Sequence, residues 1–107
     1  MSLQSTVAPV GDVLVVTLEG VVDLASVARL HSELSNALRR HAGETIVVDL
    51  DGVGALDDTA LGVLLGAAAS ARDAGGDLQV VCTEPTLRSR LERTRFDRAV
   101  DVRTSIA

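Results

Sequence analysis

A nearly continuous apolar run in the middle of the chain restricts the fold more than any other feature. The run is Thr45-Ile46-Val47-Val48-Asp49-Leu50. A strand that exposes one face alternates apolar and polar residues, whereas a strand inside a covered sheet is apolar almost throughout. A helical pattern from Asp58 to Asp73 follows after a short turn. We therefore expect a strand in the middle of a sheet, with a helix directly after it.

Strand and helix patterns alternate along the rest of the chain. The expected strands are 3–9, 13–18, 45–50, 77–83 and 99–102, the first two pairing across the Gly11-Asp12 turn. The expected helices are 24–41, 58–73 and a short one from 85. The order β-β-α-β-α-β-α-β predicts an α/β fold with a small, mixed, mostly parallel sheet of four to five strands.

Each long helix has one apolar stripe, so we expect the helices to pack on one face of the sheet. The stripe of the first helix is Val27, Leu30, Leu34, Ala37 and Leu38, and that of the second is Leu61, Leu64, Leu65 and Ala68. Gly20 is expected to close the strand before the first helix, and Asp23 to be the N-cap of that helix. Gly43 and Gly75-Gly76 are expected to end the two helices.

Composition and charge favour one domain that binds protein. A chain of 107 residues is expected to form a single domain over 1–107. The net charge of −5 disfavours nucleic acid and anionic membranes, and it suits a basic protein partner. Phe96 is the single aromatic residue, so the chain offers no platform on which bases could stack. The six arginines among residues 84–107 are expected to form a solvated face.

The sequence offers no constellation for catalysis or for a metal. His31 and His41 lie ten residues apart on one helix and point in different directions, so they are expected at the surface and cannot share a metal. Cys82 cannot form an internal disulfide, which fits a reduced, cytoplasmic setting, and it is expected to be buried filler. A phosphate-binding loop needs a lysine, and the chain has none. We expect no enzyme activity, no cofactor and no membrane insertion.

The expected helix over 58–73 opens with Asp57, Asp58 and Thr59. A helix N-terminus has free N–H groups and a positive dipole end, so it favours negative charge. Asp57 is expected to be the N-cap and to accept a hydrogen bond from the N–H of Thr59 or Ala60. Capping explains both aspartates, and for Asp58 and Thr59 surface recognition is an equal alternative.

Small residues occupy the face of this helix opposite its leucines. They are Gly62, Gly66, Ala67, Ser70 and Ala71. Small residues let a partner approach closely, although alanine is also simply the best helix former. Since glycine is costly in a helix, Gly62 and Gly66 favour a docking face. The residues expected to contact a partner are Asp57, Asp58, Thr59, Ala60, Gly62, Val63 and Gly66.

The segment Val48–Leu50, then Val53 and Leu56–Leu65, resembles the core motif of the STAS domain family, and more narrowly of the bacterial anti-sigma factor antagonists. Leu18–Asp23 and Gly75–Val81 resemble the family's flanking pieces. The resemblance implies a STAS fold and a partner that is a GHKL-type serine kinase acting as an anti-sigma factor. In such antagonists the partner binds at the start of the second helix, and phosphorylation of the hydroxyl after the motif's aspartate breaks the complex.

The chain departs from this motif at the position that is normally phosphorylated. Asp57 matches the motif's aspartate, but Asp58 stands where the serine or threonine is expected, and Ala60 replaces a glycine. Asp58 could be a fixed charge that resembles the phosphorylated state. Thr59 could instead be a displaced phosphorylation site. The switch could also be lost, leaving a constitutive binding module. The first and third readings are favoured over the second.

Two functions therefore follow from the sequence. One is an anti-sigma factor antagonist that binds a kinase through the start of the second helix. The alternative is a STAS accessory or scaffold subunit, transporter-associated or stressosome-like, without a phosphoswitch. The sequence leaves open whether the domain forms a homodimer.

Overall fold

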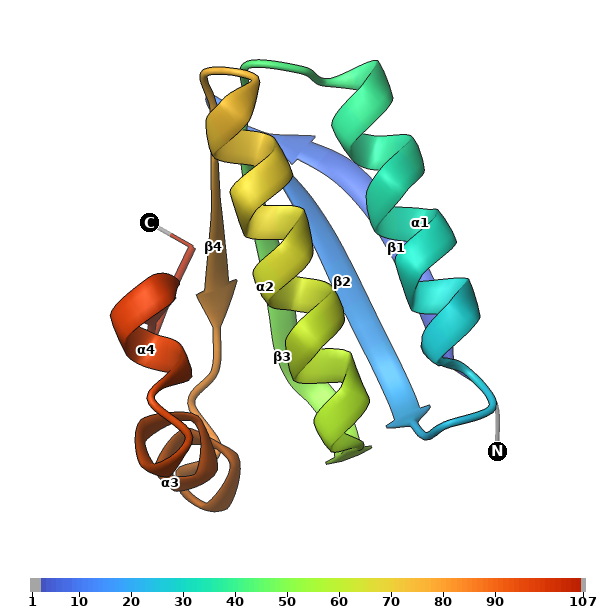
Figure 1. Cartoon of the computed structure of the whole chain (residues 1–107), viewed down its shortest axis with the longest axis vertical. Coiled ribbons are helices and arrows are strands. Elements are labelled where there is room, and N and C mark those ends of the chain that lie inside the picture. The colour runs from blue at the N-terminus through green and yellow to red at the C-terminus, as the bar shows by residue number, and fades with distance from the viewer. Residues whose placement is uncertain (1–2, 107) are drawn as a thin grey trace.

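A computed structural model describes residues 3–106. It contains a five-stranded sheet, with the long helices on one face (Figure 1). The strand order is β1-β2-β3-β4-β5; β1 and β2 are antiparallel, and the other neighbours are parallel. The strands are β1 Gln4–Val10, β2 Val13–Val22, β3 Thr45–Leu56, β4 Asp77–Val81 and β5 Asp101–Arg103. The expected mostly parallel α/β sheet is confirmed. Residues 1, 2 and 107 of the expected domain lie outside the described residues.

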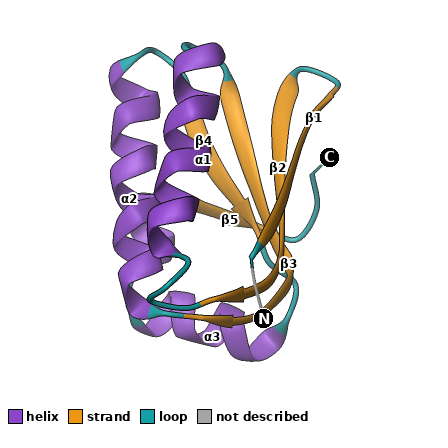
Figure 2. Ribbon diagram, turned by 90° about the vertical axis from the view of Figure 1, so that its right-hand side faces the viewer, coloured by secondary structure: helices purple, strands orange, loops and turns teal. Residues whose placement is uncertain are grey.

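Two long helices cover the sheet from one side. The helices are α1 Val27–Arg40, α2 Asp58–Asp73, α3 Pro85–Arg93 and α4 Phe96–Ala99. Figure 2 shows α1 and α2 side by side on one face, with α3 at the end of the sheet where α2 begins. The expected one-sided arrangement is therefore confirmed. The short helix α4 was not expected, because four residues carry no helical periodicity.

The central strand is confirmed, but β2 and β3 are longer than expected. Val47 and Val48 are completely buried in β3. Gly20 does not close β2; it lies inside the strand with φ of 99°. The register between β2 and β3 shifts on either side of Gly20, and an irregularity of this kind favours glycine. Both strands thus continue past their apolar runs. They end near Asp57, Asp58 and Thr59 at the start of α2, which we call the α2 tip.

The start of α1 differs from the expectation. The helix begins at Val27, and its N-cap residue is Ser26, not Asp23. Asp23 instead accepts hydrogen bonds from the backbone N–H (3.0 Å) and the hydroxyl (2.9 Å) of Ser26. The N–H of Asp23 donates back to the Ser26 hydroxyl at 2.9 Å. Asp23 therefore closes a turn ahead of the helix.

The main core lies between the sheet and the two long helices. The stripe of α1 is confirmed by its buried residues Leu30, Leu34 and Ala37. On α2 the buried residues are Ala60, Leu61, Leu64, Ala67, Ala68 and Ala71. Leu65 was wrongly placed in this stripe, since it is 38% exposed. Ala67 and Ala71 were wrongly placed on the outer face, because the core-facing row advances by three or four residues from Ala60.

A smaller apolar cluster lies on the other face of the sheet. Val15, Val47 and Val81 are buried there, and Ile106 packs against them. Figure 2 shows the C-terminal segment on the side of the sheet opposite α1 and α2. The described end of the chain therefore helps to cover the face that the helices leave open.

Candidate functional site

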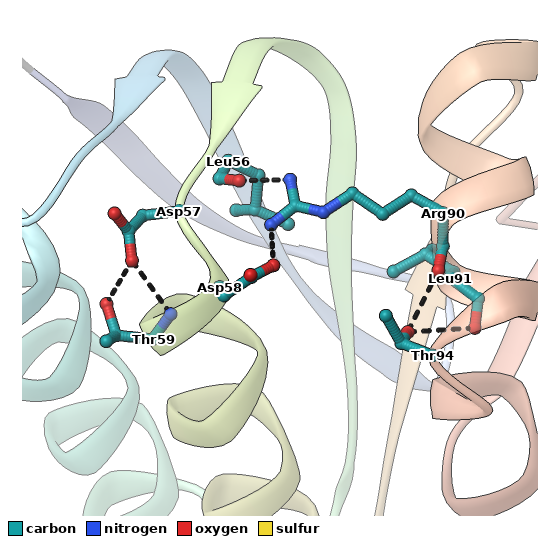
Figure 3. Close-up of polar contacts among 7 residues, drawn as sticks. All are labelled: Leu56, Asp57, Asp58, Thr59, Arg90, Leu91 and Thr94. Carbon is teal, nitrogen blue, oxygen red and sulfur yellow. Dashed lines mark hydrogen bonds and ion pairs between the residues drawn. The ribbon is translucent and has the colours of Figure 1, made fainter.

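The α2 tip is held by a hydrogen-bonded cap. Asp57 has an extended backbone (φ −68°, ψ 147°) and stands directly before the helix. One oxygen of its carboxylate, Oδ1, accepts from the backbone N–H of Thr59 at 2.8 Å and from the Thr59 hydroxyl at 2.6 Å (Figure 3). The N–H of Asp57 donates to the carbonyl of Val22 at 2.7 Å. The predicted N-cap is confirmed, with Thr59 as the donor to the side chain.

This cap has an electrostatic consequence. The pKa of the Asp57 carboxyl is lowered, chiefly by the Thr59 hydroxyl, then by the Thr59 N–H and also by the positive charge of Arg90. Hydrogen bonds to a carboxylate favour its ionised form. The α2 tip therefore keeps a charged carboxylate at its front.

Asp58 forms an ion pair that the sequence analysis missed. The Arg90 guanidinium, on α3, donates one hydrogen bond to Asp58 Oδ1 and another to the carbonyl oxygen of Leu56 (Figure 3). The Asp58 side chain is 84% exposed and that of Arg90 only 26%. Arg90 was expected on a solvated face with the other arginines. No local signal could reveal the contact, because 32 residues separate Arg90 from Asp58.

Most, but not all, of the expected contact residues are accessible. Asp58, Thr59, Gly62 and Gly66 are exposed, and Asp57 and Val63 are half-buried. Ala60 is fully buried in the core beneath the tip, so its assignment to the contact surface was wrong. The physical reason is the helical period, which places residue 60 on the core row together with Leu64.

A groove of about 520 Å³ runs between α1 and α2 and includes Thr59. We call it the α1–α2 groove. Its lining residues are Val27, His31, Leu34, Ser35, Leu38, Thr59, Gly62, Val63, Gly66, Ala67 and Ser70. None of them is an aspartate, glutamate or arginine, so the groove is apolar with a few hydroxyl groups and one imidazole. The groove is thus continuous with the α2 tip and differs from it in charge.

The two glycines of the groove are not required by packing. A Cβ atom placed at Gly62 or at Gly66 would meet nothing within 4 Å. Both residues lie inside α2, where glycine is less favourable than alanine by about 1 kcal/mol. The monomer gains no contact in return for these two glycines.

Other candidate groups lie away from the tip. His41 contacts Glu44 through Nδ1 and Oε2 at 2.9 Å, whereas His31 lines the groove. Cys82 is buried as predicted, and burial, with a smaller effect of the Asp51 carboxylate, raises the pKa of its thiol. Within residues 3–106, no three His, Cys, Asp or Glu side chains are placed to hold a metal ion. No helix in that same range has both the length and the apolar character of a transmembrane span.

The fold is similar to several solved structures. An anti-sigma factor antagonist from Mycobacterium paratuberculosis has a TM-score of 0.87 and 21% identity, covering 98% of this chain and 88% of that one. The Bacillus cell fate determinant SpoIIAA in its phosphorylated form has a TM-score of 0.70 and 19% identity, covering 95% and 93%. The murine anion transporter Slc26a9 has a TM-score of 0.75 and 14% identity, covering 92% of this chain and 17% of that one.

Of two sequence comparisons, the one with family profiles gives a match. No curated protein matches the chain significantly. A family profile described as "Mlab, STAS domain" matches residues 5–104, which is nearly the whole chain. Together with the sheet order and the helices on one face, this match identifies the chain as a member of the STAS domain family.

Proposed function

We propose that this STAS domain is a non-enzymatic, cytoplasmic regulatory protein that binds a protein partner through the α2 tip and the α1–α2 groove. The proposed contact residues are Asp57, Asp58, Thr59, Gly62, Val63 and Gly66. Ala60 supports this surface from beneath, because it is fully buried. The tip offers one charged end, and the groove offers an uncharged channel beside it.

The main support for this proposal is the pair Gly62 and Gly66, where a side chain would have free space. Gly62 and Gly66 lower the stability of α2 and contact no other part of the described chain at the Cβ position. A benefit outside the monomer would explain both residues, because a partner could approach the helix backbone where no side chain stands. Their position next to Thr59 links the groove to the tip.

The proposed partner is a GHKL-type serine kinase that acts as an anti-sigma factor. The support is the resemblance of Leu56–Leu65 to the antagonist motif and the similarity in fold to anti-sigma factor antagonists. The net charge of −5 suits a partner with a basic surface, since opposite charges speed encounter and favour the correct orientation.

A binding titration with matched variants tests the proposal. Each GHKL-type kinase of the source genome is purified and titrated against the full chain, with ADP and with ATP. Gly62→Arg fills the groove, whereas Ala69→Arg puts the same side chain on an exposed position of the same helix outside the groove lining. We expect at least tenfold weaker binding for Gly62→Arg only, which is about 1.4 kcal/mol. Equal effects of both variants would contradict the proposed surface.

A second candidate function is an accessory or scaffold STAS subunit without a phosphoswitch. The observation that favours it is Asp58, since a serine kinase cannot phosphorylate a carboxylate at the position that the motif reserves for a hydroxyl. This function predicts a stable complex that does not respond to ATP. Phosphate incorporated on Thr59 in the presence of kinase and ATP would exclude it.

A further inference from the structure

The α2 tip is tied to α3 through a single guanidinium. Arg90 reaches from α3 to the carbonyl oxygen that ends β3 and to the carboxylate that begins α2. A planar guanidinium can hold two acceptors with its two Nη groups at once, which a lysine ammonium on a flexible stem cannot do in the same geometry. Arg90 thus joins three elements, β3, α2 and α3, at the point where the partner is proposed to bind (Figure 3).

The pairing changes the charge of the tip. Asp58 and Arg90 together are formally neutral, so the tip carries one net negative charge, that of Asp57. With Arg90 in place, an unmodified serine at position 58 would leave the tip with no net charge. A phosphoserine would add about −1.5 to −2 charges at pH 7. Paired with Arg90, Asp58 therefore gives the tip less negative charge than a phosphoserine at the same position would.

We propose that Arg90 sets the charge state of the α2 tip, so that Asp58 is the counter-ion of Arg90 and does not imitate a phosphorylated side chain. This inference rests on the proposed function, in which the tip binds a protein partner. It argues against the reading in which Asp58 resembles the phosphorylated state, and it agrees with the reading in which the domain is a constitutive binding module. Arg90 is a positioning residue, because it acts through Asp58 and the Leu56 carbonyl.

Two further observations support this assignment. Arg90 is more buried than Asp58, so its charge is held in place by the protein while the carboxylate stays at the surface. Its positive charge also contributes to the lowered pKa of Asp57, so Arg90 acts electrostatically on both aspartates of the tip.

A double-mutant cycle tests the pair without any partner. The variants are Asp58→Asn, Arg90→Gln and the combination of both, with Arg93→Gln as an exposed control on the same helix. Amide hydrogen exchange at Thr59 and Ala60 reports how firmly the tip is held. We expect each single change to speed exchange by about threefold and the double change to be no worse than Arg90→Gln alone, which already loses the bond to the Leu56 carbonyl. Fully multiplicative effects of the two changes would overturn the pairing.

Carbon NMR of the Asp57 carboxyl tests the charge state. In Arg90→Gln the pKa of Asp57 should rise, since a positive charge that lowers it is removed, whereas Arg93→Gln should leave it in place. An unchanged value in Arg90→Gln would show that Arg90 does not set the potential at the tip.

Binding of a purified GHKL-type kinase then tests the functional consequence. We expect Arg90→Gln to weaken binding and the double variant to restore it, because the second change removes the uncompensated carboxylate. Tighter binding of Asp58→Asn alone would show that Asp58 imitates a phosphate and would overturn the inference. If no kinase binds the unaltered chain, the proposed function fails, while the exchange and NMR experiments still decide whether Arg90 controls the tip.

Discussion

Thr59 gives both its backbone N–H and its hydroxyl to the same oxygen of Asp57, at 2.8 and 2.6 Å. The hydroxyl that the motif leaves for modification is therefore already used within the cap. Attachment of a phosphate to Thr59 would remove the donated hydrogen and bring two negative groups together. This arrangement agrees with the lower weight given to Thr59 as a displaced phosphorylation site.

The cap predicts a specific dependence of stability on pH. The pKa of Asp57 is lowered from its ordinary value of 3.8, so its contribution is complete above that value and is lost as the pH falls through the lower, folded value. Glu84, the N-cap of α3, follows the same rule because the N–H groups of Leu87 and Thr86 lower its pKa. Urea denaturation between pH 7 and pH 2 should show falling stability in the acid range.

A valine at position 59 isolates the part of this effect that belongs to the hydroxyl. Thr59→Val keeps the backbone N–H donor but removes the largest cause of the lowered Asp57 pKa. The loss of stability below pH 4 should become shallower than in the unaltered chain. Thr6→Val on the exposed part of β1 is the matched control. Identical acid profiles for both variants and the unaltered chain would rule out the hydroxyl as the cause.

Two neighbouring leucines of α2 should respond very differently to truncation. Leu64 is completely buried, whereas Leu65 is 38% exposed. Leu64→Ala should lower the free energy of unfolding by about 2–5 kcal/mol, the range for a buried leucine. Leu65→Ala should cost less than about 1 kcal/mol, since little apolar surface is lost from the core. Comparable losses for the two variants, measured by urea denaturation, would contradict the assigned orientation of α2.

The sequence predicted those parts of the fold that depend on local pattern. Three such features were confirmed: the apolar run of β3, the stripe of α1 and the Asp57 cap. Each of them depends only on residues within one element or one turn. The stripe of α2 was harder to assign because alanine fits either face of a helix. As a result, Leu65 was predicted in the core although it is exposed, and Ala67 was predicted on the outer face although it is buried.

The parts that could not be predicted depend on contacts distant in sequence. Arg90 meets Asp58 across 32 residues, and one sequence gives no sign of that pairing. The extension of β2 through Gly20 likewise depends on its pairing with β3, where Gly20 faces Val53. The candidate site was located by motif and capping, but its charge state required the packing of α3 against the tip.

Three glycines in or just after α2 should respond to alanine with opposite changes in stability. Gly62→Ala and Gly66→Ala should each raise the free energy of unfolding by about 0.5–1 kcal/mol, because the new Cβ has open space and alanine favours the helix. At Gly76 a Cβ would stand 2.2 Å from the carbonyl oxygen of Glu44, so the backbone must shift. Gly76→Ala should lower stability by about 1–3 kcal/mol.

Urea denaturation of the three variants measures these signs directly. The partner titration then adds the functional comparison, in which Gly62→Ala and Gly66→Ala should bind the partner more weakly although the domain itself is more stable. A variant that gains stability and keeps full affinity would remove the main support for the α1–α2 groove as a docking surface. Gly76 lies between α2 and β4, beyond the groove lining, so Gly76→Ala should change stability while the remaining folded protein binds normally.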